Sequence, residues 1–225
     1  MVITTTDSSL LRLLQLSSVS LPVGGYAFSQ GMEYAIDQGW VRNKAQVGDW
    51  LSLQMQQSVA RVDLPILRLS MLAAQQQDKT RLLELNDLSL ACRETKELRL
   101  NDTAMGEALS RLLRSLSIST PFQRSEDISF VCLFAVAANH WAINFDTAAL
   151  GFTWSWLENQ IAAATKLVPL GQTQAQELLG ELQPLISEAI STSLNIEEDR
   201  IGAGLPAIAI ASAQHETQYS RLFRS

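Results

Sequence analysis

Residues 128–157 carry a single formal charge at neutral pH, that of Asp146, although the stretch is thirty residues long. Residues 61–127, in contrast, carry ten basic and ten acidic side chains, which suits helices with one solvated face. A helix that is apolar on all sides is buried, either at the centre of a bundle or beneath a partner. We therefore expect residues 128–157 to form the centre of a helical bundle, and a partner-covered surface is the alternative.

Glycine and proline are scarce, at 11 and 6 of 225 residues, which favours long uninterrupted helices. Apolar residues recur at helical spacing, and no stretch alternates strictly in the manner of a strand. Asn43 predicts a helix start, as does Asp63 with Pro65 two residues later. Asn101 and Asp102 predict a cap between two helices.

Pro184 interrupts a helical pattern and predicts a kink or a break there. Taken together, these signals predict an all-α fold with one domain over residues 1–225 and roughly eight to ten helices. Residues 1–9 form a lead-in and residues 213–225 a polar C-terminal tail, and both can be disordered when no partner is bound.

Several classes of protein are excluded or disfavoured by the composition. A net charge of −6 argues against a nucleic-acid partner, which requires a basic face. The longest apolar run, residues 130–138, is far shorter than the roughly 20 residues of a membrane span. Two cysteines suit a reducing compartment, and residues 1–9 lack the pattern of a signal peptide. We therefore expect a cytoplasmic protein.

Recognisable catalytic equipment is missing from the sequence. The segment Gly24–Gly31 lacks the lysine of a phosphate-binding loop, and no nucleophile elbow is present. His140 and His215 stand alone, and Cys92 and Cys132 are isolated, so a metal site would need a chance convergence. We predict no catalytic residue, no metal site and no cofactor.

Two segments differ in composition from the rest of the chain. The loop at 21–33 concentrates proline, glycine and aromatic residues, and residues 215–225 combine two arginines with Tyr219, Leu222 and Phe223. Arginine and aromatic side chains are enriched in binding hot spots. Residues 215–225 are therefore a candidate for partner binding, and a disordered chain end is the alternative.

Four ordered blocks carry a more specific signal: Leu-Pro-Val-Gly-Gly-Tyr at 21–26 with Ser-Gln-Gly-Met-Glu at 29–33, Arg-Glu-Thr-Lys-Glu-Leu-Arg at 93–99, Trp-Leu-Glu-Asn-Gln at 156–160 with Lys-Leu-Val-Pro-Leu-Gly-Gln at 166–172, and Gln-Tyr-Ser-Arg-Leu-Phe-Arg-Ser at 218–225. Together these blocks resemble the family of the urease accessory protein UreF, and they span nearly the whole chain. Residues 207–210 and 213–214 depart from the family, whose members more often place Asp, Met or Arg there.

The resemblance implies an all-helical, dimeric protein that is not an enzyme and acts as a chaperone in urease maturation. It implies an adaptor that joins the accessory protein UreD (also called UreH) and the GTPase UreG. The complex would act on apo-urease so that nickel enters in a GTP-dependent step. The alternative is a factor that activates or delays GTP hydrolysis by UreG, with Arg221, Glu33 or Lys166 as candidates.

Candidate binding residues follow from the resemblance and from the residue types. The partner-binding set comprises Tyr26, Glu33, Lys166, His215, Glu216, Tyr219, Arg221, Leu222, Phe223 and Arg224. The loop-shaping set, whose members are expected to position the backbone and not to touch a ligand, comprises Pro22, Gly24, Gly25 and Gly31. For Lys166 a simple role at a helix C-terminus is the alternative.

Overall fold

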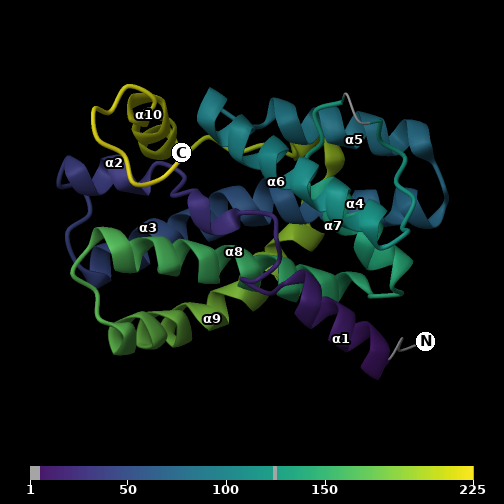
Figure 1. The fold of residues 1–225 in the computed structure, drawn as a ribbon, viewed down its shortest axis with the longest axis horizontal. Helices are drawn as coiled ribbons and strands as arrows, with labels where there is room; N and C mark the ends of the chain where they lie inside the picture. The colour runs from purple at the N-terminus through teal and green to yellow at the C-terminus, as the bar shows by residue number, and fades with distance from the viewer. Residues whose placement is uncertain (1–5, 124–125, 225) are drawn as a thin grey trace.

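The computed structural model of the chain describes residues 6–123 and 126–224. All regular structure in these residues is helical, which confirms the predicted all-α class (Figure 1). The α-helices are α1 (Asp7–Leu16), α2 (Met32–Asp37), α3 (Lys44–Gln54), α4 (Leu64–Gln75), α5 (Lys79–Ala91), α6 (Lys96–Ser115), α7 (Phe130–His140), α8 (Phe145–Leu167), α9 (Gln172–Leu194) and α10 (Pro206–His215). Short 3-10 helices lie at Gly25–Ala27 and Glu198–Arg200. No helix in the described ranges is long and apolar enough to span a membrane.

Helix α7, from the nearly uncharged stretch 128–157, lies at the centre of the bundle. Every residue from Val131 to Ala138 in α7 is buried, and α7 packs between α4 and α6. Rings on α7 and α8 meet there, with the centroids of Phe134 and Phe152 5.2 Å apart. Within the chain, burial at the core accounts for the missing charges of α7.

Helix α4 begins at Leu64, directly after Asp63 and with Pro65 in its first turn, as predicted, but no break precedes it and the Asp63 side chain does not cap it. The chain runs without interruption from α3 through a π-helical segment, Met55–Asp63, into α4. The N–H of Leu64 donates to the carbonyl of Val59, five residues earlier. This wider turn accommodates a proline, which has no N–H of its own to donate. The Asp63 side chain is buried and bonds to another part of the fold instead of capping a helix.

The predicted cap at Asn101 and Asp102 is also wrong, because both residues lie buried inside α6. The cap of α6 is Thr95, whose hydroxyl accepts the N–H of Leu98 at 3.1 Å. Asp102 does satisfy a free helix-end N–H, but it is that of Phe130 at the start of α7, 2.7 Å away. Asp102 therefore caps α7, a helix distant in sequence, and not the helix on which it lies.

Pro184 lies inside α9 without breaking it. The proline and Gly180, four residues earlier, are both on the exposed side of the helix. The carbonyl that loses its donor there can bind water, so the cost of the proline is reduced. The predicted start at Asn43 is confirmed, since its side chain accepts the N–H of Gln46 at 3.1 Å.

The chain end lies against an early part of the chain. After α10, residues 216–224 turn back toward α2, so the C-terminus lies beside α2 and far from the N-terminus (Figure 1). Helix α10 itself packs on α2 and α6. The fold therefore brings the first and last of the four sequence blocks into contact.

Candidate partner-binding site

The site begins with the close approach of α2 and α10 at Gly31. Gly31 adopts a φ of +84°, in the left-handed region that favours glycine. A Cβ atom at this position would lie 3.0 Å from the backbone nitrogen of Ser212 and 3.2 Å from the carbonyl oxygen of Ile208, both in α10. Gly31 therefore allows α10 to lie directly over the start of α2, which places Glu33 beside the chain end. Gly24 has a φ of +77° and sets the turn before the 3-10 helix.

Glu33, in the first turn of α2, is buried and binds the C-terminal segment, which we define as residues 216–224. Its carboxylate accepts the backbone N–H groups of Leu222 at 2.6 Å and Phe223 at 2.9 Å. The same carboxylate lies 3.0 Å from Nε2 of His215. One buried acid thus fixes two points of the chain end by charge-assisted hydrogen bonds.

Glu97, in the first turn of α6, binds the other side of the same histidine. Its Oε2 lies 2.8 Å from Nδ1 of His215, and its Oε1 accepts from Nη1 of Arg221 at 3.0 Å. The His215 side chain is 0% exposed, and Glu97 is buried. His215 and Arg221 therefore connect the end of the chain to α2 and α6 together.

Contacts of Phe223 and Arg224 also bring the sequence block around Lys166 and the N-terminal loop to the chain end. The ring of Phe223 is buried, and Nζ of Lys166, in the last turn of α8, lies 5.6 Å from its centroid. The N–H of Arg224 donates to the carbonyl of Ala27 at 2.9 Å, and its guanidinium carbon lies 5.7 Å from the ring of Phe28. Parts of all four sequence blocks thus meet in space.

The candidate residues divide into an inward and an outward set. The inward set, which holds the chain end on the body, consists of Glu33, His215 and Phe223. Tyr26 at 58% exposure, Leu222 at 64% and the fully exposed Tyr219 point outward. Among the other candidates, Glu216 is half-buried, and the exposed ones are Pro22, Lys166, Arg221 and Arg224.

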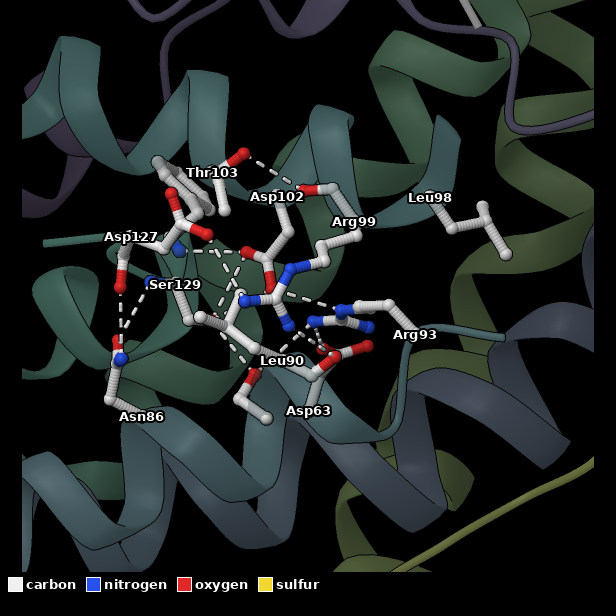
Figure 2. A network of polar contacts seen from close by, with 12 residues as sticks. Asp63, Asn86, Leu90, Arg93, Leu98, Arg99, Asp102, Thr103, Asp127 and Ser129 are labelled. Carbon is white, nitrogen blue, oxygen red and sulfur yellow. Dashed lines mark hydrogen bonds and ion pairs between the residues drawn. The ribbon is translucent and has the colours of Figure 1, made fainter. Parts of the chain in front are cut away.

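A second polar cluster, which the sequence analysis missed, is centred on Arg93 (Figure 2). Its Nη2 donates to Asp63 at 2.6 Å and its Nε to Asp102 at 2.9 Å. Asp102 also accepts from the Ser129 hydroxyl, and the N–H of Ser129 donates to Asn86. The cluster joins α6, α7, α5 and the π-helical segment. Its partners are up to 30 residues apart in sequence from Arg93, so no local pattern could have predicted it.

Burial and the neighbouring charges shift the pKa values of Asp63 and Arg93 in opposite directions. Burial raises the pKa of Asp63 above its ordinary value, although the positive charge of Arg93 opposes the shift. Burial alone would lower the pKa of Arg93, but the two carboxylates together raise it, so the guanidinium stays charged. The buried guanidinium of Arg93 therefore forms ion pairs with both Asp63 and Asp102.

A cavity of about 110 Å³ adjoins the Arg93 cluster. Three buried amide atoms that lack a hydrogen-bond partner within the described structure belong to side chains lining it: Nε2 of Gln54, Oδ1 of Asn101 and Oε1 of Gln160. Such a lining suits ordered water. Across residues 6–123 and 126–224, no three His, Cys, Asp or Glu side chains are arranged to hold a metal ion.

Comparison with known proteins identifies the family. The UreF family model matches residues 41–183, which is more than half of the chain. The chain belongs to the UreF family. The urease accessory protein UreF of Marinomonas sp. (strain MWYL1) is 78% identical over 223 residues, covering 99% of this chain and 97% of that protein. The UreF proteins of Alkalilimnicola ehrlichii and Hahella chejuensis are 46% and 44% identical, covering 95% and 96% of this chain and 95% and 98% of theirs.

These relatives cover parts of the site that the family model leaves out. Glu33 and the C-terminal segment lie outside residues 41–183, whereas Glu97 and Lys166 lie inside. The full-length UreF relatives nevertheless align over almost the whole chain. The predicted resemblance to UreF is confirmed, and this chain stands among the urease accessory proteins.

Proposed function

We infer that this chain is a non-enzymatic adaptor in urease maturation. It joins UreD (UreH) and the GTPase UreG in a cytoplasmic complex that delivers nickel to apo-urease in a GTP-dependent step. Membership of the UreF family supports the role in urease maturation. The partners follow from the sequence resemblance, and the surface around the C-terminal segment offers them a binding site.

The observation that carries the proposal is the outward set of side chains on the C-terminal segment and the N-terminal loop. Tyr219, Leu222 and Tyr26 are all more than half exposed, although each has an aromatic or apolar body. Aromatic side chains of this kind commonly anchor protein interfaces. The buried bonds of Glu33 hold the backbone beneath Leu222, so a partner would spend less entropy in ordering it.

Two of the residues considered for an action on GTP hydrolysis are bound within the chain. Glu33 is buried against the chain end, and Arg221 is paired with Glu97. Their engagement favours the adaptor over a factor that inserts an arginine or carboxylate into the nucleotide site of UreG. Lys166 remains exposed and is the residue of that set best placed to reach a partner.

The homodimer belongs to the same proposal, and α1 offers a surface for it. Leu10, Leu11 and Leu14 on this helix are exposed, and an open groove of about 410 Å³ runs between α1, α8 and α9. Exposed apolar side chains beside a groove are typical of oligomer interfaces.

Co-purification tests the adaptor. Tagged chain is mixed with UreD and UreG, and the complex is isolated and sized by gel filtration. Tyr219→Ala and Leu222→Ala are expected to lower the recovery of the complex at least tenfold while the thermal melt is unchanged, because both side chains are exposed. Leu194→Ala, at an exposed leucine on α9, is the matched control and is expected to bind normally. Separate elution of the wild-type chain and UreD would refute the adaptor.

A further inference from the structure

His215 lies between acids from two different helices. Glu33 on α2 faces its Nε2 at 3.0 Å, and Glu97 on α6 faces its Nδ1 at 2.8 Å. Arg221 of the C-terminal segment is the remaining charged group of the cluster and binds the second oxygen of Glu97. Helix α10 carries His215 itself and adds no other ionisable side chain to these contacts.

A neutral imidazole cannot satisfy both neighbours. It has one N–H donor and one unprotonated nitrogen, whose lone pair would point at a carboxylate oxygen. An imidazolium donates from both nitrogens and matches both distances. The burial of the ring, at 0% exposure, leaves no water to separate an unmatched pair.

Both acids also accept hydrogen bonds from donors other than His215. Glu33 already accepts the N–H groups of Leu222 and Phe223, and Glu97 accepts from the Arg221 guanidinium. Hydrogen bonds to a carboxylate favour its charged state, so the shared proton belongs on the histidine. Two carboxylates, one imidazolium and one guanidinium then sum to zero charge, as a buried cluster requires.

We propose that His215 is a buried imidazolium that latches the C-terminal segment onto α2 and α6, so that loss of its proton releases residues 217–224 from the body. A deprotonated ring turns one of its two hydrogen bonds into a repulsive contact. Because Glu33 also holds the backbone of Leu222 and Phe223, a displaced Glu33 loses those bonds too. The latch thereby regulates whether the outward set of residues is presented on a fixed backbone. Only this last consequence rests on the proposed adaptor function.

Nuclear magnetic resonance of the full chain tests the latch directly. The chain has two histidines, and the exposed His140 serves as the internal reference signal. Ring ¹⁵N shifts are followed from about pH 5 to about pH 10, across the ordinary range of histidine. Backbone order parameters of residues 217–224 are measured on the same samples. We expect both ring nitrogens of His215 to be protonated while the segment is ordered. We expect the order parameters to fall from about 0.85 to below about 0.6 as the ring loses its proton.

The substitution Glu97→Gln separates the latch from simple packing. A glutamine can keep its oxygen on Arg221 and donate its N–H to the unprotonated Nδ1 of a neutral His215. The segment of this variant is expected to stay ordered at alkaline pH, where the wild-type segment is released. The substitution His215→Gln removes the charge while keeping a polar side chain and is expected to leave the segment mobile at every pH.

The possible outcomes decide the proposal. Loss of order that follows the His215 titration, and its suppression in Glu97→Gln, would support the latch. A neutral His215 in the ordered state, a wild-type segment that is mobile at every pH, or release that persists in Glu97→Gln would overturn it. None of these readouts involves UreD or UreG, so a failure of the adaptor proposal would be recognised separately in the co-purification.

Discussion

Replacing Arg93 with methionine tests whether the Arg93 cluster holds the fold together. The substitution keeps an unbranched side chain of similar length and removes the guanidinium. It deletes the bonds to Asp63 at 2.6 Å and to Asp102 at 2.9 Å. The side chains of Arg93, Asp63 and Asp102 are 15%, 10% and 6% exposed, so solvent can replace little of what is lost.

The two acids are affected to different degrees. Asp102 keeps the hydroxyl of Ser129 and the N–H of Phe130 as donors, whereas the described structure gives Asp63 no hydrogen-bond donor besides Arg93. Removing one partner of a buried ion pair costs about 3–5 kcal/mol because a charge is left uncompensated. We expect Arg93→Met to lower the free energy of unfolding by about that amount at neutral pH, mainly through Asp63.

The free energy of unfolding lost in Arg93→Met should depend on pH in a defined direction. Burial raises the pKa of Asp63, and Arg93 opposes this shift, so the pKa rises further once the arginine is removed. An acid whose pKa is higher in the folded than in the unfolded state folds best when it is protonated. Its contribution to stability is fully present below the unfolded value of about 3.9 and is lost as the pH rises through the folded value. The difference between wild type and variant is therefore expected to shrink between about pH 7 and about pH 5.

Chemical denaturation followed by tryptophan fluorescence measures this difference at both pH values. The control is Arg111→Met, which removes an exposed ion pair with Glu107 on α6 and is expected to cost at most about 0.5 kcal/mol. A loss below about 1 kcal/mol for Arg93→Met, or a loss that is equal at both pH values, would refute the reasoning from burial.

Two further predictions concern packing and thiol chemistry. Gly106→Ala is expected to lower the free energy of unfolding by about 1–3 kcal/mol, as measured by a thermal melt. The reason is that the new Cβ would lie 1.9 Å from the carbonyl oxygen of Ile128. Gly180→Ala, which meets nothing within 4 Å, is the control and should stabilise by about 0.4–1 kcal/mol. Burial raises the pKa of Cys132 to about 12, so a thiol reagent should modify it only after unfolding. The pKa of the half-buried Cys92 is also raised by burial, so its modification should be slow and should accelerate as the pH rises; rapid modification of both cysteines in the native chain would contradict this assignment.

The helical class could be predicted from the sequence because its signals are local. Scarce glycine and proline, helical periodicity and the cap at Asn43 each act within a few residues. The burial of α7 was likewise predictable, because a stretch of this length without charge has few other stable environments. The partner-binding roles of the C-terminal residues remain predictions, whereas their contact with the N-terminal loop is a feature of the fold.

The errors share one cause, which is that polar residues were interpreted through their sequence neighbours. Asp63 and Asp102 have the chemistry of caps, but both bind Arg93 from different elements. Asn101 faces the cavity rather than a helix end. Local propensity cannot identify such partners, since the bonds exist only after α6, α7 and the π-helical segment have packed.

Helix α6 connects the two polar clusters, one around His215 and one around Arg93. This explains why the sequence block at residues 93–99 occurs together with the blocks near the two ends of the chain. Glu97 holds His215 and Arg221, whereas Asp102, five residues later on the same helix, holds Arg93 and the start of α7. The cap residue Thr95 also reaches α10, with 2.7 Å between its hydroxyl and that of Ser212. Glu97, which binds the C-terminal segment, thus lies on the same helix as Asp102 of the Arg93 cluster. In the proposed latch, this shared helix links the bonds that hold His215 and Arg221 to those that hold the start of α7.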